Sequence, residues 1–286
     1  MTGRVTKARW VVAALFAALG ATSCGEGTGT VTVSLWGEDY IRDVIPAATT
    51  TTAGFENGWS LRYTKFLVNL GEVRLTTSTG RVAGTLANFR VYDLHALTGP
   101  TTIGTFANVD AVRYDAASFS LAPVEIGAAG NATAADVQLM QVGRYAIYVD
   151  ATASKMGAAD VRIRWGFRGR TDFSPCSDAA GQAGLAVPTG GTASFQVTVH
   201  GDHLFYDDLE NPDARMRFDA IAGADADGDH EVTLDELSRV ALTSLPMTQY
   251  SAGPVPNVRN LRDFVTYLFA TVGHFNGEGH CQERRS

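Results

Sequence analysis

Seven stretches of the sequence alternate apolar and polar residues with a period of two, and this pattern limits the fold more than any other feature. A strand that packs one face on a core requires such alternation, because successive side chains point to opposite faces. Gly-, Thr- and Ala-rich segments separate the stretches, as turns do. The pattern predicts a mainly β protein, an antiparallel sandwich or barrel. The stretches are 30–36, 59–75 (one strand, or two that part near Asn69 or Gly71), 89–94, 109–121, 144–153, 161–169 and 193–201.

The apolar spacing changes to that of helices in the last third of the chain. We expect a first helix from Asn211, a favourable N-cap, and a second from Thr233, which forms a capping-box pattern with Glu236. A third helix is expected from Asn260, with an apolar stripe typical of core packing. We read 127–137 as a loop of low information. The sequence therefore predicts a β-sandwich-like domain at 31–203 and a carboxyl-terminal helical region at 204–286.

The amino terminus has the form of an export signal. Basic residues precede an apolar segment at 10–21, which is too short to span a bilayer. Small residues then lead to Cys24, and this order resembles a bacterial lipoprotein signal at 1–23, in which Cys24 receives the lipid. The resemblance implies export, a tether at 24–30 and a lipid anchor in the cell envelope, at the outer membrane. An ordinary secretory signal is the alternative.

The cysteine count and the charge limit the chemistry. With Cys24 assigned to lipid, Cys176 and Cys281 are left as a pair, and an exported location favours a disulfide between them over two free thiols. The chain has 30 acidic and 23 basic residues, a net charge of −7. This balance opposes nucleic acid as a partner and is compatible with cations. The sequence does not identify a protein partner.

The stretch DADGDHEVTLDE at 225–236 has the ligand spacing of a calcium loop. Calcium takes six to eight oxygen ligands, and a twelve-residue loop supplies them from alternate positions. The expected ligands are Asp225, Asp227, Asp229, Glu231 (through its backbone carbonyl), Thr233 and Glu236. The stretch and its flanks, about 211–245, resemble the EF-hand family, which implies one helix–loop–helix calcium site inside the helical region. We expect a structural role for the ion; a solvated acidic turn is the alternative.

One position departs from the EF-hand pattern. The sixth loop position, usually glycine, is His230. That position needs a positive φ, which glycine adopts at no steric cost and which costs another residue on the order of 1 kcal/mol. We therefore expect a weaker calcium site, in the range of about 10⁻⁴–10⁻³ M found in extracellular modules.

Four late histidines form a second candidate metal site, for copper or zinc. They are His200, His203, His274 and His280. Residues three apart on a strand point to opposite faces, so His200 and His203 can both bind one ion only if the strand ends there. The stretch YTKFLVNLGEVRL at 63–75 resembles a strand motif of the MbnP-like copper-binding family, which implies copper binding without identifying the ligands. The plan of signal, β domain, acidic loop and GEGHC end is similar to uncharacterised lipoproteins of myxobacteria.

The sequence gives no sign of catalysis. It contains no GxSxG, HExxH or phosphate-loop motif. We therefore expect a calcium-binding envelope lipoprotein with a structural or binding role and no enzymatic activity. A copper-binding protein that uses the late histidines is the first alternative, and a hydrolase with dispersed catalytic residues is the second.

Overall fold

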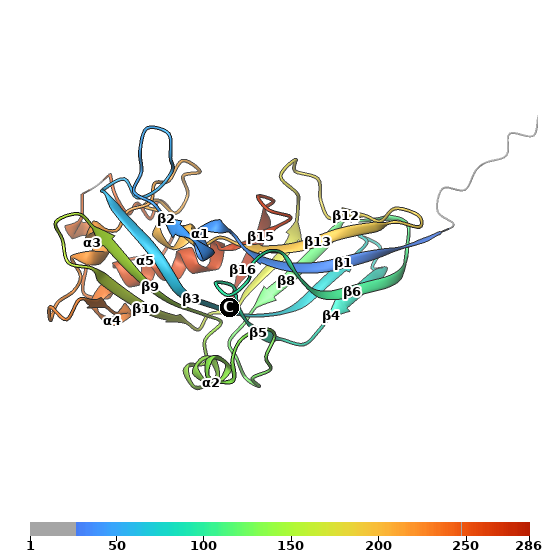
Figure 1. The fold of residues 1–286 in the computed structure, drawn as a ribbon. Coiled ribbons are helices and arrows are strands. Elements are labelled where there is room, and N and C mark those ends of the chain that lie inside the picture. Colours follow the sequence, from blue (N-terminus) through green and yellow to red (C-terminus); the bar gives the residue numbers. More distant parts are fainter. Residues whose placement is uncertain (1–26, 247) are drawn as a thin grey trace, which may run out of the picture.

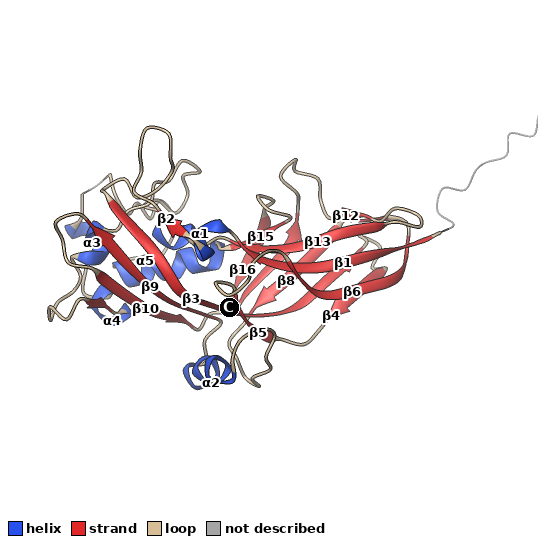
Figure 2. Ribbon diagram, viewed as in Figure 1, coloured by secondary structure: helices blue, strands red, loops and turns tan. Residues whose placement is uncertain are grey.

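Strands dominate the computed structural model, which describes residues 27–246 and 248–286 (Figures 1 and 2). The strands are β1 (Thr28–Gly37), β2 (Val44–Ile45), β3 (Trp59–Thr76), β4 (Val82–Leu86), β5 (Arg90–Asp93), β6 (Thr101–Asp110), β7 (Arg113–Tyr114), β8 (Ala116–Leu121), β9 (Ile147–Lys155), β10 (Val161–Phe167), β11 (Thr171–Cys176), β12 (Leu185–Ala186), β13 (Thr192–Val199), β14 (Glu231–Val232), β15 (Gly273–Phe275) and β16 (Cys281–Arg285). The helices are α1 (Asp39–Arg42), α2 (Ala134–Gly143), α3 (Asp219–Ala222), α4 (Leu234–Leu237) and α5 (Leu261–Leu268), with 3₁₀ turns η1 (Asp202–Phe205), η2 (Leu242–Ser244) and η3 (Phe269–Thr271). The mainly β class is confirmed.

Two sheets share one apolar core. The smaller has the strand order β15-β13-β1-β6, and the larger has the order β14-β10-β9-β3-β8-β11-β16, with β2, β4 and β5 also paired to β3. Val33 of β1 and Val197 of β13 lie in the same buried cluster as Phe119 and Phe173 of the larger sheet. Burial of such side chains is the main favourable contribution to folding. This arrangement is consistent with the predicted sandwich.

The long strand β3 links the two halves of the larger sheet. Its first part pairs with β9 from Trp59 to Val68, and its second part pairs with β8 from Leu70 to Thr76. The stretch that was expected to form one strand or two is therefore one strand that changes partner. A shift of register lies between Gly71 and Arg74. Gly71 is required there, because a Cβ would lie 2.8 Å from the Cα of Phe89.

The helices gather beside β9 and β10 at one end of the molecule, apart from α2 (Figure 2). Two helix starts are where the sequence places them. Asn260 Oδ1 accepts a hydrogen bond from Asp263 N at 2.9 Å, and Thr233 and Glu236 form the reciprocal capping box. The first expected helix differs, because α3 begins only at Asp219.

The backbone before α3 pairs across the fold instead of coiling. Asp207 N donates to Arg215 O at 2.9 Å, and Arg217 N donates to Phe205 O at 2.9 Å. Met216 also bridges to two other segments. These bonds use the groups that a helix would need. Helix α3 is consequently only four residues long, and α4 beyond the acidic loop also has four residues.

Helix α2 lies in the segment that was expected to be a loop. Thr133 and Asp136 form its capping box, and the buried Asp136 carboxylate accepts a hydrogen bond from Lys65 of β3. The ion pair fixes the start of the helix on the sheet. Composition concealed this helix, because Gly, Ala, Asn and Thr surround the cap.

The carboxyl-terminal third completes both sheets. Strand β15 pairs with β13, β14 with β10, and β16 with β11. In the described part of the chain, no helix is long and apolar enough to cross a membrane. The predicted signal at 1–23, the lipidated Cys24 and the start of the tether lie outside the described residues.

Candidate metal centre

Three of the four late histidines meet at one point. His200 follows the last residue of β13, His203 lies in η1, and His274 lies in β15. Strand β13 ends at Val199, so the condition set by the sequence for His200 and His203 is met. The register of β13 and β15 pairs Thr198 with His274. The chain thus brings residues more than seventy positions apart to one end of the smaller sheet.

The ligand atoms of this histidine cluster (His200, His203 and His274) all lie within 4.8 Å of one another. The ring centroids are 4.1 Å apart for His200 and His274, 4.9 Å for His203 and His274, and 5.3 Å for His200 and His203. His200 and His274 are each 4% exposed. Bulk water is therefore largely excluded from the space between the rings.

Neighbouring side chains contact two of the imidazole rings at Nδ1. His200 Nδ1 lies 3.3 Å from Glu38 Oε2, and His203 Nδ1 lies 3.0 Å from Thr271 Oγ1. By contrast, His200 Nε2 and His274 Nδ1 are buried without a hydrogen-bond partner among the described residues. A buried polar atom without a partner is costly and uncommon. Histidine ligands of metals show this arrangement, with one ring nitrogen anchored and the other free for the ion.

The cluster favours neutral imidazoles. Burial is the main cause that lowers the pKa of His274 to about 2, and the other histidines nearby lower it further. Burial also lowers the pKa of His203 to about 4, although the Asp202 carboxylate opposes this change. Neutral imidazole is the form that binds a metal. At neutral pH these two rings are therefore ready as ligands without losing a proton.

Two carboxyl groups adjoin the cluster, the half-buried Glu38 and the buried Asp202. Glu38 Oε1 accepts a hydrogen bond from Gly201 N at 2.9 Å, and Asp202 Oδ2 accepts one from the Tyr206 hydroxyl at 2.7 Å. Burial, then the charge of Asp202, raises the pKa of Glu38 to about 9. Glu38, His200 and Asp202 form a second group whose ligand atoms lie within 4.8 Å of one another. His200 therefore belongs to both groups.

Glu38 had no signal in the sequence. It follows the last residue of β1, and β1 runs parallel to β13, with Gly37 opposite Val199. Glu38 N donates to Val199 O at 3.1 Å. Parallel neighbours that are so distant in the chain leave no local pattern. Only the tertiary fold brings this carboxylate to His200.

His280 stays outside the histidine cluster. Its side chain is exposed, and its ring centroid lies 5.2 Å from that of His274. It belongs to the turn between β15 and β16. The structure thus joins three of the four predicted histidines and leaves the fourth beside them at the surface.

The acidic loop brings three carboxylates together. Ligand oxygens of Asp225, Asp227 and Asp229 lie within 4.8 Å of one another. His230 has a φ of 64°, as its loop position requires, and His230 N donates to Asp225 Oδ2 at 3.0 Å. Gly228 N donates to Asp225 Oδ1 at 2.8 Å. The first half of the loop is therefore wrapped around Asp225.

The second half of the loop is engaged elsewhere. Glu236 accepts hydrogen bonds from Thr233 N at 2.8 Å and from Ala226 N at 3.0 Å. The Glu231 side chain pairs with Arg164 of β10. The Glu236 carboxylate thus does not join the group of three aspartates. The helix–loop–helix form of an EF-hand is not seen, since each flanking helix is four residues long.

The predicted disulfide between Cys176 and Cys281 is confirmed. It joins residues 105 positions apart, and the two cysteines are register partners on β11 and β16. The bond ties the end of the chain to the larger sheet. Cys281 is also the residue directly after His280 in the sequence.

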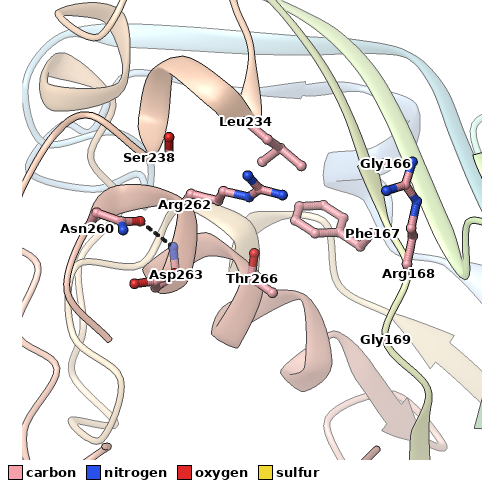
Figure 3. A pocket seen from close by; sticks show the side chains of 10 residues that line it. All are labelled: Gly166, Phe167, Arg168, Gly169, Leu234, Ser238, Asn260, Arg262, Asp263 and Thr266. Atoms are coloured by element: carbon pink, nitrogen blue, oxygen red, sulfur yellow. Dashed lines mark hydrogen bonds between the residues drawn. The ribbon is translucent and has the colours of Figure 1, made fainter. Parts of the chain in front are cut away.

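A surface cavity of about 500 Å³ lies between the end of β10 and helices α4 and α5 (Figure 3). Figure 3 shows Arg168 and Arg262 on its walls and the hydrogen bond between Asn260 and Asp263 at its floor. Each arginine already donates one hydrogen bond to the protein. Arg168 donates to Gly143 O at 2.8 Å, and Arg262 donates to Asp235 Oδ1 at 3.1 Å. None of the ten lining residues is a histidine or a cysteine.

Comparison with known proteins adds no family to this geometry. No family model, no curated protein and no solved structure matches the chain.

Proposed function

We propose that the protein binds one copper or zinc ion at His200, His203 and His274. The observation that carries the proposal is the pair of buried ring nitrogens, His200 Nε2 and His274 Nδ1, which lie in a cluster of three imidazoles and have no hydrogen-bond partner in the described part of the chain. Imidazole nitrogen suits both metals. An ion bound there would satisfy both nitrogens at once.

The outer groups fit a metal centre. Glu38 and Thr271 each hold the Nδ1 of a histidine, so Nε2 is the nitrogen that His200 and His203 would present to the ion. Asp202 lies close enough to compensate part of the charge of a divalent ion in this buried place, and Glu38 would add to this by releasing its proton when the ion binds. Among divalent ions, copper binds a given nitrogen site more tightly than zinc, so we propose copper as the preferred occupant.

A titration of the metal-free protein tests this proposal. We expect one equivalent of Cu²⁺ to bind, with Zn²⁺ as a weaker competitor, and His274→Ala to abolish that equivalent. Glu38→Gln should weaken binding about tenfold, as loss of an outer partner does. His95→Ala is the matched control, because His95 lies outside the cluster and contacts Ile41 O at 2.8 Å. Copper binding that survives His274→Ala would refute the site.

Calcium binding by the acidic loop is a second candidate function. It is favoured by the converging carboxylates of Asp225, Asp227 and Asp229 and by the positive φ of His230. The carboxylate of Glu236, which caps its own helix, would have to turn toward the ion to supply two further oxygens. Calorimetry with Ca²⁺ tests this function, and Asp225→Asn should abolish the heat of calcium binding.

We infer the cellular location of both candidate sites from the sequence. The lipoprotein-like signal at 1–23 and Cys24 support an exported, lipid-anchored protein of the cell envelope. With no catalytic motif in the sequence, we propose a binding or structural role and no enzymatic one. Incorporation of labelled palmitate into the unaltered chain, and its loss in Cys24→Ala, tests the anchor.

A further inference from the structure

Two rings of the histidine cluster are buried and that of His203 is half-buried, whereas the fourth late histidine is exposed. His200 and His274 are each 4% exposed, so an ion from solution does not meet them first. His280 is exposed, and its ring centroid lies 5.2 Å from that of His274. It does not belong to the group of ligand atoms within 4.8 Å. An exposed imidazole thus lies beside His274 without being part of the cluster.

The turn that carries His280 is held firmly in place. Phe275 and Gly279 exchange two backbone hydrogen bonds of 2.9 and 3.0 Å, which close a tight hairpin. Asn276 N donates to Gln196 O at 2.9 Å, and Gly277 N donates to Thr198 Oγ1 at 3.0 Å. These bonds fix the hairpin to β13, the strand that leads into His200. The backbone position of His280 is therefore set by the fold.

We propose that His280 is a loading ligand, which takes the copper or zinc ion from solvent and passes it to His274. This inference rests on the metal site proposed above. Glu278 is exposed on the same hairpin, two residues before His280, and its negative charge draws cations to the hairpin. The fourth histidine thus acts on the rate of metal uptake and leaves the coordination of the held ion to the other three.

The transfer is a sequence of ligand exchanges without oxidation or reduction. The hydrated ion loses one water as a ring nitrogen of His280 binds it. His274 Nδ1 then displaces a second water, and the bond to His280 breaks as His200 and His203 complete the coordination. Stepwise exchange lowers the barrier of entering a dry site, because the ion is never stripped of all its ligands at once.

Stopped-flow mixing of Cu²⁺ with the metal-free protein tests this role. We expect His280→Ala to lower the association and the dissociation rate constants equally, by about tenfold, so that the dissociation constant stays the same. Both rates fall because the ion leaves by the path through which it enters. Glu278→Gln should lower association by roughly threefold at low salt and less at high salt.

The structure supplies a control and a safeguard. Gln282→Ala alters an exposed neighbour on β16 and should load at the unaltered rate. His280→Ala should keep its fold, because the backbone oxygen of His280, and not its ring, accepts a bond from Ser177 N at 2.8 Å. An unchanged association rate in His280→Ala would overturn the loading role. A larger dissociation constant together with an altered copper spectrum would also overturn the loading role, because His280 would then be a permanent ligand. If the unaltered protein bound no copper, the metal site itself would fail along with the loading role.

Discussion

Thr198 and His274 face each other across β13 and β15, and this one register pair aligns the end of the chain with its candidate metal ligands. A shift by one residue would send the His274 side chain to the opposite face of the sheet. Thr198 Oγ1 also accepts the hydrogen bond from Gly277 N, so the same residue holds the hairpin that carries His280. The register of a three-residue strand therefore decides whether the cluster forms.

The metal-free protein should lose stability as the pH rises from 7 to 9. Glu38 keeps its proton in the folded protein up to a pKa of about 9, whereas the unfolded chain releases it near 4.5. The folded state thus binds more protons in this window, and the free energy of unfolding should fall by about 1.4 kcal/mol per pH unit. Urea denaturation at pH 7 and pH 8.5 measures the fall. Glu38→Gln should show a much flatter dependence, and an equally steep one would contradict the assignment to Glu38.

Acid should destabilise the metal-free protein through the histidine cluster. The pKa of His203 is lowered from 6.5 to about 4, so the unfolded chain gains a proton first as the pH falls below 6.5. Stability is lost from there down to the folded pKa, by about 2 kcal/mol at pH 5. Glu38 acts with the opposite sign in this window, so the informative quantity is the difference between His203→Gln and the unaltered protein. The variant should lose less stability between pH 7 and pH 5.

Removal of the disulfide should destabilise the protein. Cys176 and Cys281 close a loop of 105 residues, and the loss of such a constraint on the unfolded chain costs about 2–5 kcal/mol. The double substitution Cys176→Ala with Cys281→Ala should show this loss in urea denaturation. Reduction of the unaltered protein should give a similar shift, and reduction of the double variant should give none.

Replacement of His230 by glycine should tighten calcium binding. The φ of 64° at His230 is costly for a residue with a side chain, by about 1 kcal/mol, which corresponds to roughly a fivefold change in affinity. Calorimetry of His230→Gly and the unaltered protein measures the ratio. Gly228→Ala is the opposing control, because the φ of 76° at Gly228 would then be strained and binding should weaken. If His230→Gly bound calcium with the same affinity as the unaltered protein, backbone strain at His230 would not be the cause of weak binding.

Local patterns predicted the elements but could not predict the site. The alternation at 59–75 gave β3, and Asn260 gave the start of α5, because side-chain alternation and capping depend on near neighbours. The pairing of Cys176 with Cys281 followed from the number of cysteines and an oxidising location. In contrast, the helix expected from Asn211 competes with backbone bonds to segments that the sequence does not reveal. Local propensity yields to such tertiary partners.

The metal ligands show the same limit. His200, His203, His274 and His280 could be named from the sequence, yet no spacing rule separates the three that converge from the fourth. The separation follows from the register of β15 on β13 and from the exposed turn beyond it. Glu38 could not be predicted from the sequence at all, because the parallel pairing of β1 with β13 is a property of the assembled sheet.

The parallel pairing of β1 with β13 also sets when the centre comes into existence. Glu38 lies near the start of the described chain and His274 near its end, so a growing or truncated polypeptide holds only fragments of the site. An ion at the proposed site would consequently find all its ligands in place only after β1, β13 and β15 have assembled, so its retention would distinguish finished molecules from incomplete ones.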